Sequence, residues 1–127
     1  MTFSFGTRSK ERLKGVHPDL VKVIEEAIKG SPLDFSITEG LRTKERQKEL
    51  FDAGKSQTMN SRHLTGKAVD IAVLVDGKVT WDAKYYIPVI DHIKSVAKKF
   101  DIPIVSGGDW VTFKDYPHIE LHRSVYT

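Results

Sequence analysis

The chain has to fold without covalent cross-links, because its 127 residues include no cysteine. Its stability must come from one hydrophobic core, and a domain of this length can bury roughly two-thirds of its unfolded surface. We therefore expect a single domain over residues 1–127. The same absence excludes a disulfide scaffold, a cysteine-ligated metal site and a cysteine nucleophile. Any catalysis or metal binding must use His, Asp, Glu, Ser, Thr, Lys or Tyr side chains.

The charge balance is mildly basic, with 20 Lys and Arg against 17 Asp and Glu and a net charge of +3. This suits an anionic partner without identifying one. The short charge run at residues 10–14 indicates a solvated face, and no predicted helix gathers cations on one side, which disfavours a nucleic-acid-binding protein. The sequence shows neither a secretory signal nor a membrane-spanning stretch, so we expect synthesis in the cytoplasm and no stable membrane association.

Hydrophobic periodicity predicts three helices. The first spans residues 18–29, where the apolar side chains fall on one face and His17 fills the N-cap position. The second runs from a Thr43 cap to residue 53. The third covers residues 82–100, and Pro88 should kink or restart it.

Short runs of β-branched and aromatic residues predict the strands. They cover residues 35–38, 68–75, 78–81, 102–105 and 118–121, with an Asp-Gly hairpin turn at 76–77 and loops at 54–64 and 106–109. This pattern predicts an α+β fold, in which about three helices flank a small, mainly antiparallel sheet.

A histidine and an aspartate stand seven residues apart within one segment. His63 lies in a polar loop, whereas Asp70 falls inside the apolar strand expected over residues 68–75. An aspartate is disfavoured there and needs a partner if it is partly buried, such as a metal ion, an arginine or a backbone cap. The spacing alone leaves the metal-binding and structural interpretations equally open.

A second cluster begins at Asp115 and contains His118, Glu120 and His122. It is not a zincin helix, because Ile119 stands where that motif needs a glutamate. In a strand, the two histidines and Glu120 share one face. That face is either the polar side of an edge strand or a site in which His118 binds a metal and a nearby acid activates water.

Together the two clusters supply three ligands, His63, Asp70 and His118. Catalytic zinc typically has three protein ligands and an open position for water, with a carboxylate nearby as general base. Asp115 is the best candidate for that base, and Glu120 is either the alternative or a partner of a ligand.

Residues 61–70 match the SxHxxGxAxD motif of zinc D-alanyl-D-alanine peptidases and their relatives. The Asp115-x-x-His118 segment resembles the ending of phage L-alanyl-D-glutamate peptidase endolysins, since the carboxypeptidase branch usually carries Glu at the position of Asp115. Residues 40–43 resemble the G-x-R-[ST] segment of the same family, and residues 3–6 and 108–110 are also similar to these endolysins.

The resemblance implies a zinc-dependent endopeptidase that cuts the L-Ala–D-Glu bond in the stem peptide of peptidoglycan. It implies that His63, Asp70 and His118 hold one Zn²⁺ in a cleft at the sheet. It also implies that Asp115 takes a proton from water and passes it to the leaving amine. Arg42 would stabilise the tetrahedral intermediate or a substrate carboxylate, although an arginine there could also simply flank a helix.

Other side chains are implied near the substrate or the ligands: Ser61, Thr43, Gln47, Trp110 and Glu120. Ser61 would orient a ligand or the substrate, and Gln47 would be structural or a partner of Arg42. Trp110 would shape the cleft wall, although a tryptophan is more often part of the core.

As a biological role, the resemblance implies a monomeric phage endolysin that is made in the host cytoplasm and depends on a holin for release to the wall. From the length of 127 residues, we expect a catalytic domain without a separate wall-binding domain. The alternatives are a D-Ala-D-Ala carboxypeptidase or dipeptidase with the same metal site, and a non-catalytic binding module that keeps zinc as structure.

Overall fold

The computed structural model describes residues 3–56, 61–110 and 114–126. Its helices are α1 (Thr7–Arg12), α2 (Pro18–Gly30), α3 (Lys44–Asp52) and α4 (Ala83–Lys99), with 3₁₀ helices η1 (Arg62–Thr65) and η2 (Gly107–Asp109). Its strands are β1 (Asp34–Glu39), β2 (Ala68–Val75), β3 (Lys78–Thr80), β4 (Ile104–Ser106) and β5 (His118–Leu121). The predicted α+β class is confirmed.

All strand pairs are antiparallel, and β2 is the centre of the sheet. The order is β1-β2-β5-β4. β3 and β5 pair with the same edge of β2, β5 with its first residues and β3 with its last. The register of β1 shifts between Ile37 and Glu39, and this irregularity places Glu39 opposite Asp70. Because side chains alternate along a strand, Ile71 and Val73 of β2 point into the core, whereas Asp70 points to the opposite face and is partly exposed.

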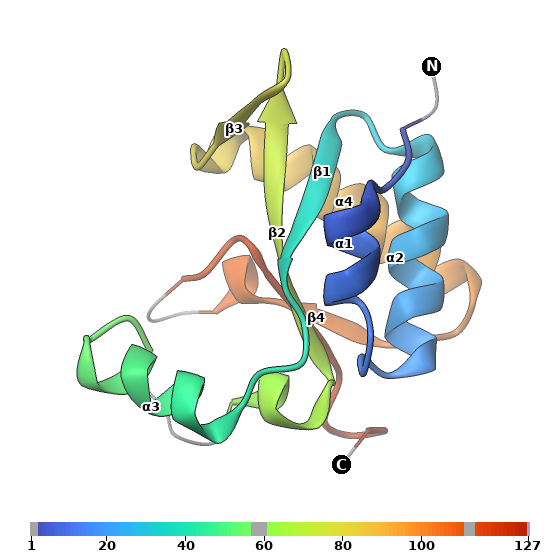
Figure 1. Cartoon of the computed structure of the whole chain (residues 1–127). Helices are drawn as coiled ribbons and strands as arrows, with labels where there is room; N and C mark the ends of the chain where they lie inside the picture. The colour runs from blue at the N-terminus through green and yellow to red at the C-terminus, as the bar shows by residue number, and fades with distance from the viewer. Residues whose placement is uncertain (1–2, 57–60, 111–113, 127) are drawn as a thin grey trace.

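The core lies between the sheet and the helices. In Figure 1, α1, α2 and α4 gather on one side of the strands, and α3 stands apart at the lower left. α2 packs against α4, and its buried face is the one that the periodicity predicts. None of the helices in the described ranges combines the length and the apolar character needed to cross a membrane.

The helix caps follow the sequence prediction. His17 Nδ1 accepts the Asp19 N–H at 3.1 Å, which caps α2, and the Thr43 hydroxyl accepts the Arg46 N–H at 3.1 Å, which caps α3. Pro88 does not interrupt α4, which is one helix from Ala83 to Lys99. Buried side chains before and after the proline pack on the core, and this packing outweighs the lost backbone hydrogen bond.

Several expectations are corrected by the structure. No helix is predicted before residue 18, whereas α1 packs on β1, where the buried Ser9 hydroxyl accepts the Ile37 N–H at 3.0 Å; the charged side chains at residues 10–14 are exposed, as expected. β4 is Ile104–Ser106 rather than residues 102–105. β5 lies between β2 and β4, so it is not an edge strand. The loop at 54–64 contains the start of η1, and its residues 57–60 lie outside the described residues.

Candidate active site

His63 is held in one orientation by its own backbone and by a distant carbonyl. The Ser61 hydroxyl accepts the His63 N–H at 3.2 Å and starts η1, which ends at Gly66 in the left-handed conformation. The buried imidazole has its Nδ1 2.8 Å from the Gly40 carbonyl oxygen. A carbonyl only accepts, so Nδ1 carries a hydrogen and Nε2 is the ring nitrogen left to bind a metal. That Nε2 lies 3.2 Å from Asp70 Oδ1.

His118 reaches the same carboxylate with its other ring nitrogen. It is paired with Asp70 in the ladder between β5 and β2, and its Nδ1 lies 3.3 Å from Asp70 Oδ1. Its Nε2 lies 2.9 Å from Oε1 of the buried Glu120. The two strand residues do share a face, as the sequence predicts, and Glu120 orients the ring so that Nδ1 points at Asp70.

The ligand atoms of His63, Asp70 and His118 all lie within 4.8 Å of one another. The two imidazole rings meet edge to face, with centroids 5.1 Å apart. Two neutral imidazole nitrogens and one carboxylate oxygen form a donor set that suits a divalent metal such as zinc. His63 Nδ1 already bonds the Gly40 carbonyl, and His118 Nε2 already bonds Glu120. The other nitrogen of each ring can therefore bind a metal ion together with Asp70 while these hydrogen bonds are kept.

Hydrogen bonds within the cluster shift the pKa values of Asp70 and His118 in opposite directions. Burial would raise the pKa of Asp70, but its hydrogen bonds with His118 and His63 hold that pKa well below the usual range. Burial would likewise lower the pKa of His118, but the Asp70 and Glu120 carboxylates raise it to about 9.

Asp115 sits beside the cluster on the connection between β4 and β5. Its N–H donates to the Gly107 carbonyl at 3.0 Å, and its own carbonyl accepts the His118 N–H at 3.0 Å. Burial raises the pKa of the half-buried Asp115 carboxyl, and the Asp70 carboxylate raises it further against the two histidines and Arg42. A carboxyl with a raised pKa beside a metal-binding group is suited to proton transfer.

Comparison with known proteins agrees with this geometry. The model of the phage L-alanyl-D-glutamate peptidase family matches residues 1–126. The L-alanyl-D-glutamate peptidase of Escherichia phage T5 is 35% identical over 130 residues, which cover 99% of this chain and 94% of that protein.

The chain belongs to the phage L-alanyl-D-glutamate peptidase family.

Other relatives of the peptidase support the assignment. Peptidoglycan L-alanyl-D-glutamate endopeptidase CwlK of Bacillus subtilis is 32% identical, covering 84% of this chain and 73% of that protein. The crystal structure of Serratia marcescens L-Ala D-Glu endopeptidase ChiX superposes with a TM-score of 0.92 at 45% identity, covering 98% and 94% of the two chains. The D,D-dipeptidase VanXYg, at a TM-score of 0.52 and 15% identity over 84% and 50%, shares the fold alone.

Arg42 of the peptidase is buried in a network rather than solvated beside α3. Its Nε and Nη2 donate to the two oxygens of Glu39, each at 2.8 Å, and Nη2 also reaches Asp70 Oδ2 at 3.4 Å. Its Nη1 donates to Oε1 of the fully buried Gln47 at 2.7 Å. Gln47 is therefore a partner of Arg42, and the arginine holds the Asp70 carboxylate, one of the three groups that could bind a metal.

Two residues that hold the side chains of the site are not among those expected from the sequence. Glu39 is the residue before the G-x-R-[ST] segment, and it holds Arg42 through a bidentate pair. Arg62 is the variable position of the SxHxxGxAxD motif, and its Nε lies 3.6 Å from Glu120 Oε2. The available signal was only their position next to motif residues, because neither contact is visible from local spacing.

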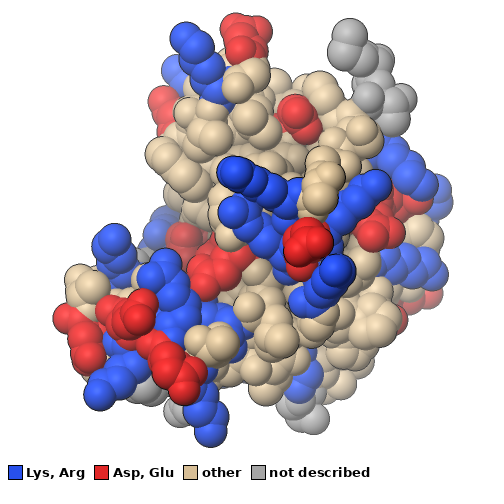
Figure 2. Space-filling model, viewed as in Figure 1, with Lys and Arg blue, Asp and Glu red and all other residues tan. Residues whose placement is uncertain are grey.

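Of the other candidate residues, Ser61 and Trp110 contact the histidines, whereas Thr43 and His122 are exposed. Ser61 contacts His63 through the backbone N–H, and the ring of the half-buried Trp110 lies 5.0 Å from that of His118. Thr43 is exposed, and its described contact is the α3 cap. His122 is exposed and bonds Ser124, so it is not part of the described cluster. Figure 2 shows the surface hollowed between α3 and the rest of the molecule, with acidic side chains in the hollow.

The raised pKa of His118 leads to a prediction about the metal-free peptidase. Since the pKa is about 9 in the folded state and near 6.5 in the unfolded state, the stabilisation is complete below about pH 6.5 and disappears as the pH rises to about 9. Metal binding must displace this proton, so the apparent affinity should rise by up to about ten-fold per pH unit between pH 7 and 9. Zinc titration calorimetry in buffers of different ionisation enthalpy would measure the released proton, and a pH-independent affinity would contradict the assignment.

Gly107 permits the close approach that positions Asp115. A Cβ at this residue would lie 2.2 Å from the Asp115 carbonyl oxygen and 3.0 Å from His118 Cβ. Gly107→Ala is expected to destabilise the peptidase by about 1–3 kcal/mol and to lower turnover, because the backbone of Asp115 must move. Thermal unfolding and kinetics would measure both effects.

Gly30→Ala is the matched control for this substitution, since a Cβ there meets His92 ring atoms at 3.5 Å, which is ordinary contact. It should leave activity unchanged. Equal stability and turnover in the two variants would show that the approach at Gly107 is not needed.

Proposed function

We propose that the peptidase is a zinc-dependent endolysin that hydrolyses the L-Ala–D-Glu bond of the peptidoglycan stem peptide. The observation that carries this proposal is the convergence of the ligand atoms of His63, Asp70 and His118 beside the half-buried carboxyl of Asp115. The names of the phage T5, Bacillus and Serratia relatives support the choice of bond.

A zinc ion held by these three residues would polarise the scissile carbonyl and make water a better nucleophile at neutral pH. Asp115 accepts a proton from the attacking water at its carboxylate and later donates it to the leaving amine. Burial raises the pKa of the Asp115 carboxyl, which makes the carboxylate a stronger base for the first transfer.

Arg42 supports the reaction from the edge of the cluster. Its described contacts use four of the five guanidinium N–H groups, and the fifth is on Nη1. We propose that this N–H stabilises negative charge on the substrate while Glu39 and Gln47 hold the plane of the guanidinium. Trp110 forms part of the cleft wall beside His118, Ser61 orients His63, and Glu120 orients His118.

Digestion of purified muropeptides followed by mass spectrometry tests the scissile bond. The proposal expects two products, a disaccharide carrying L-Ala alone and a peptide that begins with D-Glu. Release of the terminal D-Ala alone would replace the endolysin with a carboxypeptidase. Binding of muropeptides without any cleavage would indicate a binding module.

We also propose that the enzyme acts as a monomer with one zinc ion on the wall of the host, after release from the cytoplasm through a holin pore. The phage T5 relative supports this setting. Sedimentation of the loaded protein together with metal analysis would test the monomer and the single ion. Lysis of host cells with and without a co-expressed holin would test the route of release.

A further inference from the structure

Trp81 is a large aromatic side chain that the proposed chemistry does not use. It is 64% exposed, although exposed tryptophans are costly to leave in water. Its indole lies over Tyr86, with ring centroids 6.3 Å apart and planes 15° from parallel. Tyr86 is fully buried, donates its hydroxyl to the Thr80 carbonyl at 2.7 Å and accepts the Val73 N–H at 3.2 Å. One face of the indole therefore rests on a fixed support, and the side chain is otherwise largely open to solvent.

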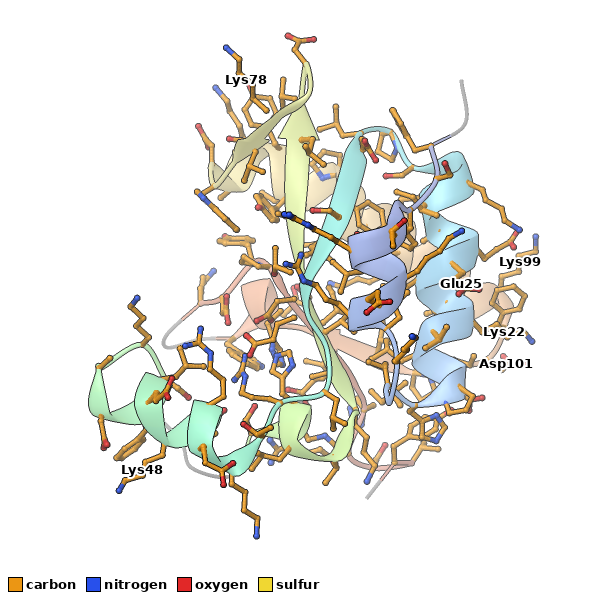
Figure 3. The ribbon with its side chains drawn as sticks, in the orientation of Figure 1. Lys22, Glu25, Lys48, Lys78, Lys99 and Asp101 are labelled. Carbon is orange, nitrogen blue, oxygen red and sulfur yellow. The ribbon has the colours of Figure 1, made fainter. Side chains whose placement is uncertain are left out.

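The strand register carries Trp81 toward the metal-binding cluster. Figure 3 shows Lys78 near the tip of the β2–β3 hairpin, and β3 runs from there to Thr80, which pairs with Val73. Trp81 comes next along this edge of β2, in the direction of Asp70. Val73 is three residues from Asp70, which is about 10 Å along a strand. β5 occupies the same edge beyond this point. The Tyr86 hydroxyl bonds the Val73 N–H on this edge, and Trp81 stacks on Tyr86, so the indole lies beside the stretch of β2 between its pairings with β3 and β5.

The separation of about 10 Å between Val73 and Asp70 is comparable to the length of the substrate segment on the N-terminal side of the scissile bond. In peptidoglycan, L-Ala is joined through a lactyl group to the ring of the muramic acid sugar. One residue and one lactyl group span at most about 7 Å, since each unit covers up to about 3.5 Å. The sugar ring therefore begins about 7 Å from the scissile carbonyl, a span comparable to the separation of about 10 Å between Asp70 and Val73, whose N–H bonds the Tyr86 that supports Trp81.

The surroundings of Trp81 suit a sugar ring. A pyranose presents C–H groups on its faces, which pack on an aromatic plane, and hydroxyl groups at its rim, which need polar partners. Asp82 and Lys84 follow Trp81 and form an ion pair at 3.8 Å, and Asp82 also accepts the Lys84 N–H at 3.2 Å. Both side chains are still more than half exposed, at 54% and 68%. A flat apolar surface with a donor and an acceptor beside it has the composition of a saccharide contact.

We propose that Trp81 is a specificity-determining contact that binds the muramic acid ring of peptidoglycan. This inference rests on the proposed function, because it places the scissile L-Ala–D-Glu bond at the metal ligands. The consequence is a preference for stem peptides that are still attached to the glycan over free peptides of the same sequence.

The test compares two ligands, a disaccharide muropeptide and the same stem peptide without sugar. Binding is measured by calorimetry on zinc-loaded protein carrying Asp115→Asn, so that neither ligand is consumed. Adding Trp81→Ala should weaken muropeptide binding by about two- to ten-fold and leave free-peptide binding unchanged. Trp81→Phe should retain most of the affinity, because it keeps an aromatic face. Val79→Ala, which removes another exposed apolar side chain from the same hairpin, should change neither.

The outcomes separate this inference from the proposed function. Equal loss for both ligands would mean that Trp81 contacts the peptide, and no loss for either would mean that it contacts nothing; both results overturn the inference. If the active enzyme cuts a different bond but Trp81→Ala still weakens only the muropeptide, the sugar contact stands and the proposed function fails. Unchanged thermal unfolding of the Trp81 variants confirms that folding is intact.

Discussion

Replacing Asp115 with Asn is expected to reduce kcat by about 10²–10⁴-fold, because an amide cannot accept the proton of the attacking water. The half-buried carboxyl is close enough for Asp70, His118, His63 and Arg42 to influence its pKa, yet it is not a member of the metal-binding group. Zinc content should therefore stay at the wild-type level. Steady-state kinetics on a muropeptide and metal analysis of the same preparation measure the two quantities.

Asp109→Asn is the matched control for this prediction. Asp109 lies in η2 and is an exposed carboxylate that pairs with Lys94, and it is not a member of the group of described residues that could hold a metal. The same change of carboxylate to amide should leave turnover within a few-fold of wild type. If Asp115→Asn kept full activity, or lost zinc along with activity, the general-base role would be wrong.

Removing the metal should have an equally large effect. Incubation with a chelator is expected to abolish peptidase activity, and added zinc should restore it. His63→Ala should give a protein that neither binds zinc nor cleaves the substrate, because it removes one of three ligands and leaves the Gly40 carbonyl without its donor. Metal analysis, calorimetric zinc titration and kinetics follow the loss.

The exposed His122 provides the control, since it bonds Ser124 and is outside the metal-binding group of described residues. His122→Ala should bind zinc and cleave normally. Full activity in excess chelator would remove the metal from the mechanism. An active His63→Ala variant would show that the ligand set is different.

Local patterns were sufficient where the determining interactions are close in sequence. The caps at His17 and Thr43 and the buried face of α2 follow from residues within a few positions of one another. The alternation in β5 put His118 and Glu120 on one face for the same reason. The interior position of β5, by contrast, depends on pairing with β2 and β4, which no local pattern encodes. The position of α1 depends equally on a contact between Ser9 and Ile37, 28 residues apart.

The sequence by itself determined which side chains are available for chemistry. A chain without cysteine that carries SxHxxGxAxD and D-x-x-H has one natural set of nitrogen and oxygen ligands, and the structure brings its three members together. Only the tertiary structure decided how those side chains are oriented. His63 presents Nε2 because the Gly40 carbonyl, 23 residues away in sequence, holds its Nδ1. His118 and Arg42 are held by the nearby Glu120 and Glu39, but both meet Asp70 only when β5 and β1 pair with β2. The convergence of these side chains depends on contacts between strands, and these exist only after β1, β2, η1 and β5 have packed together.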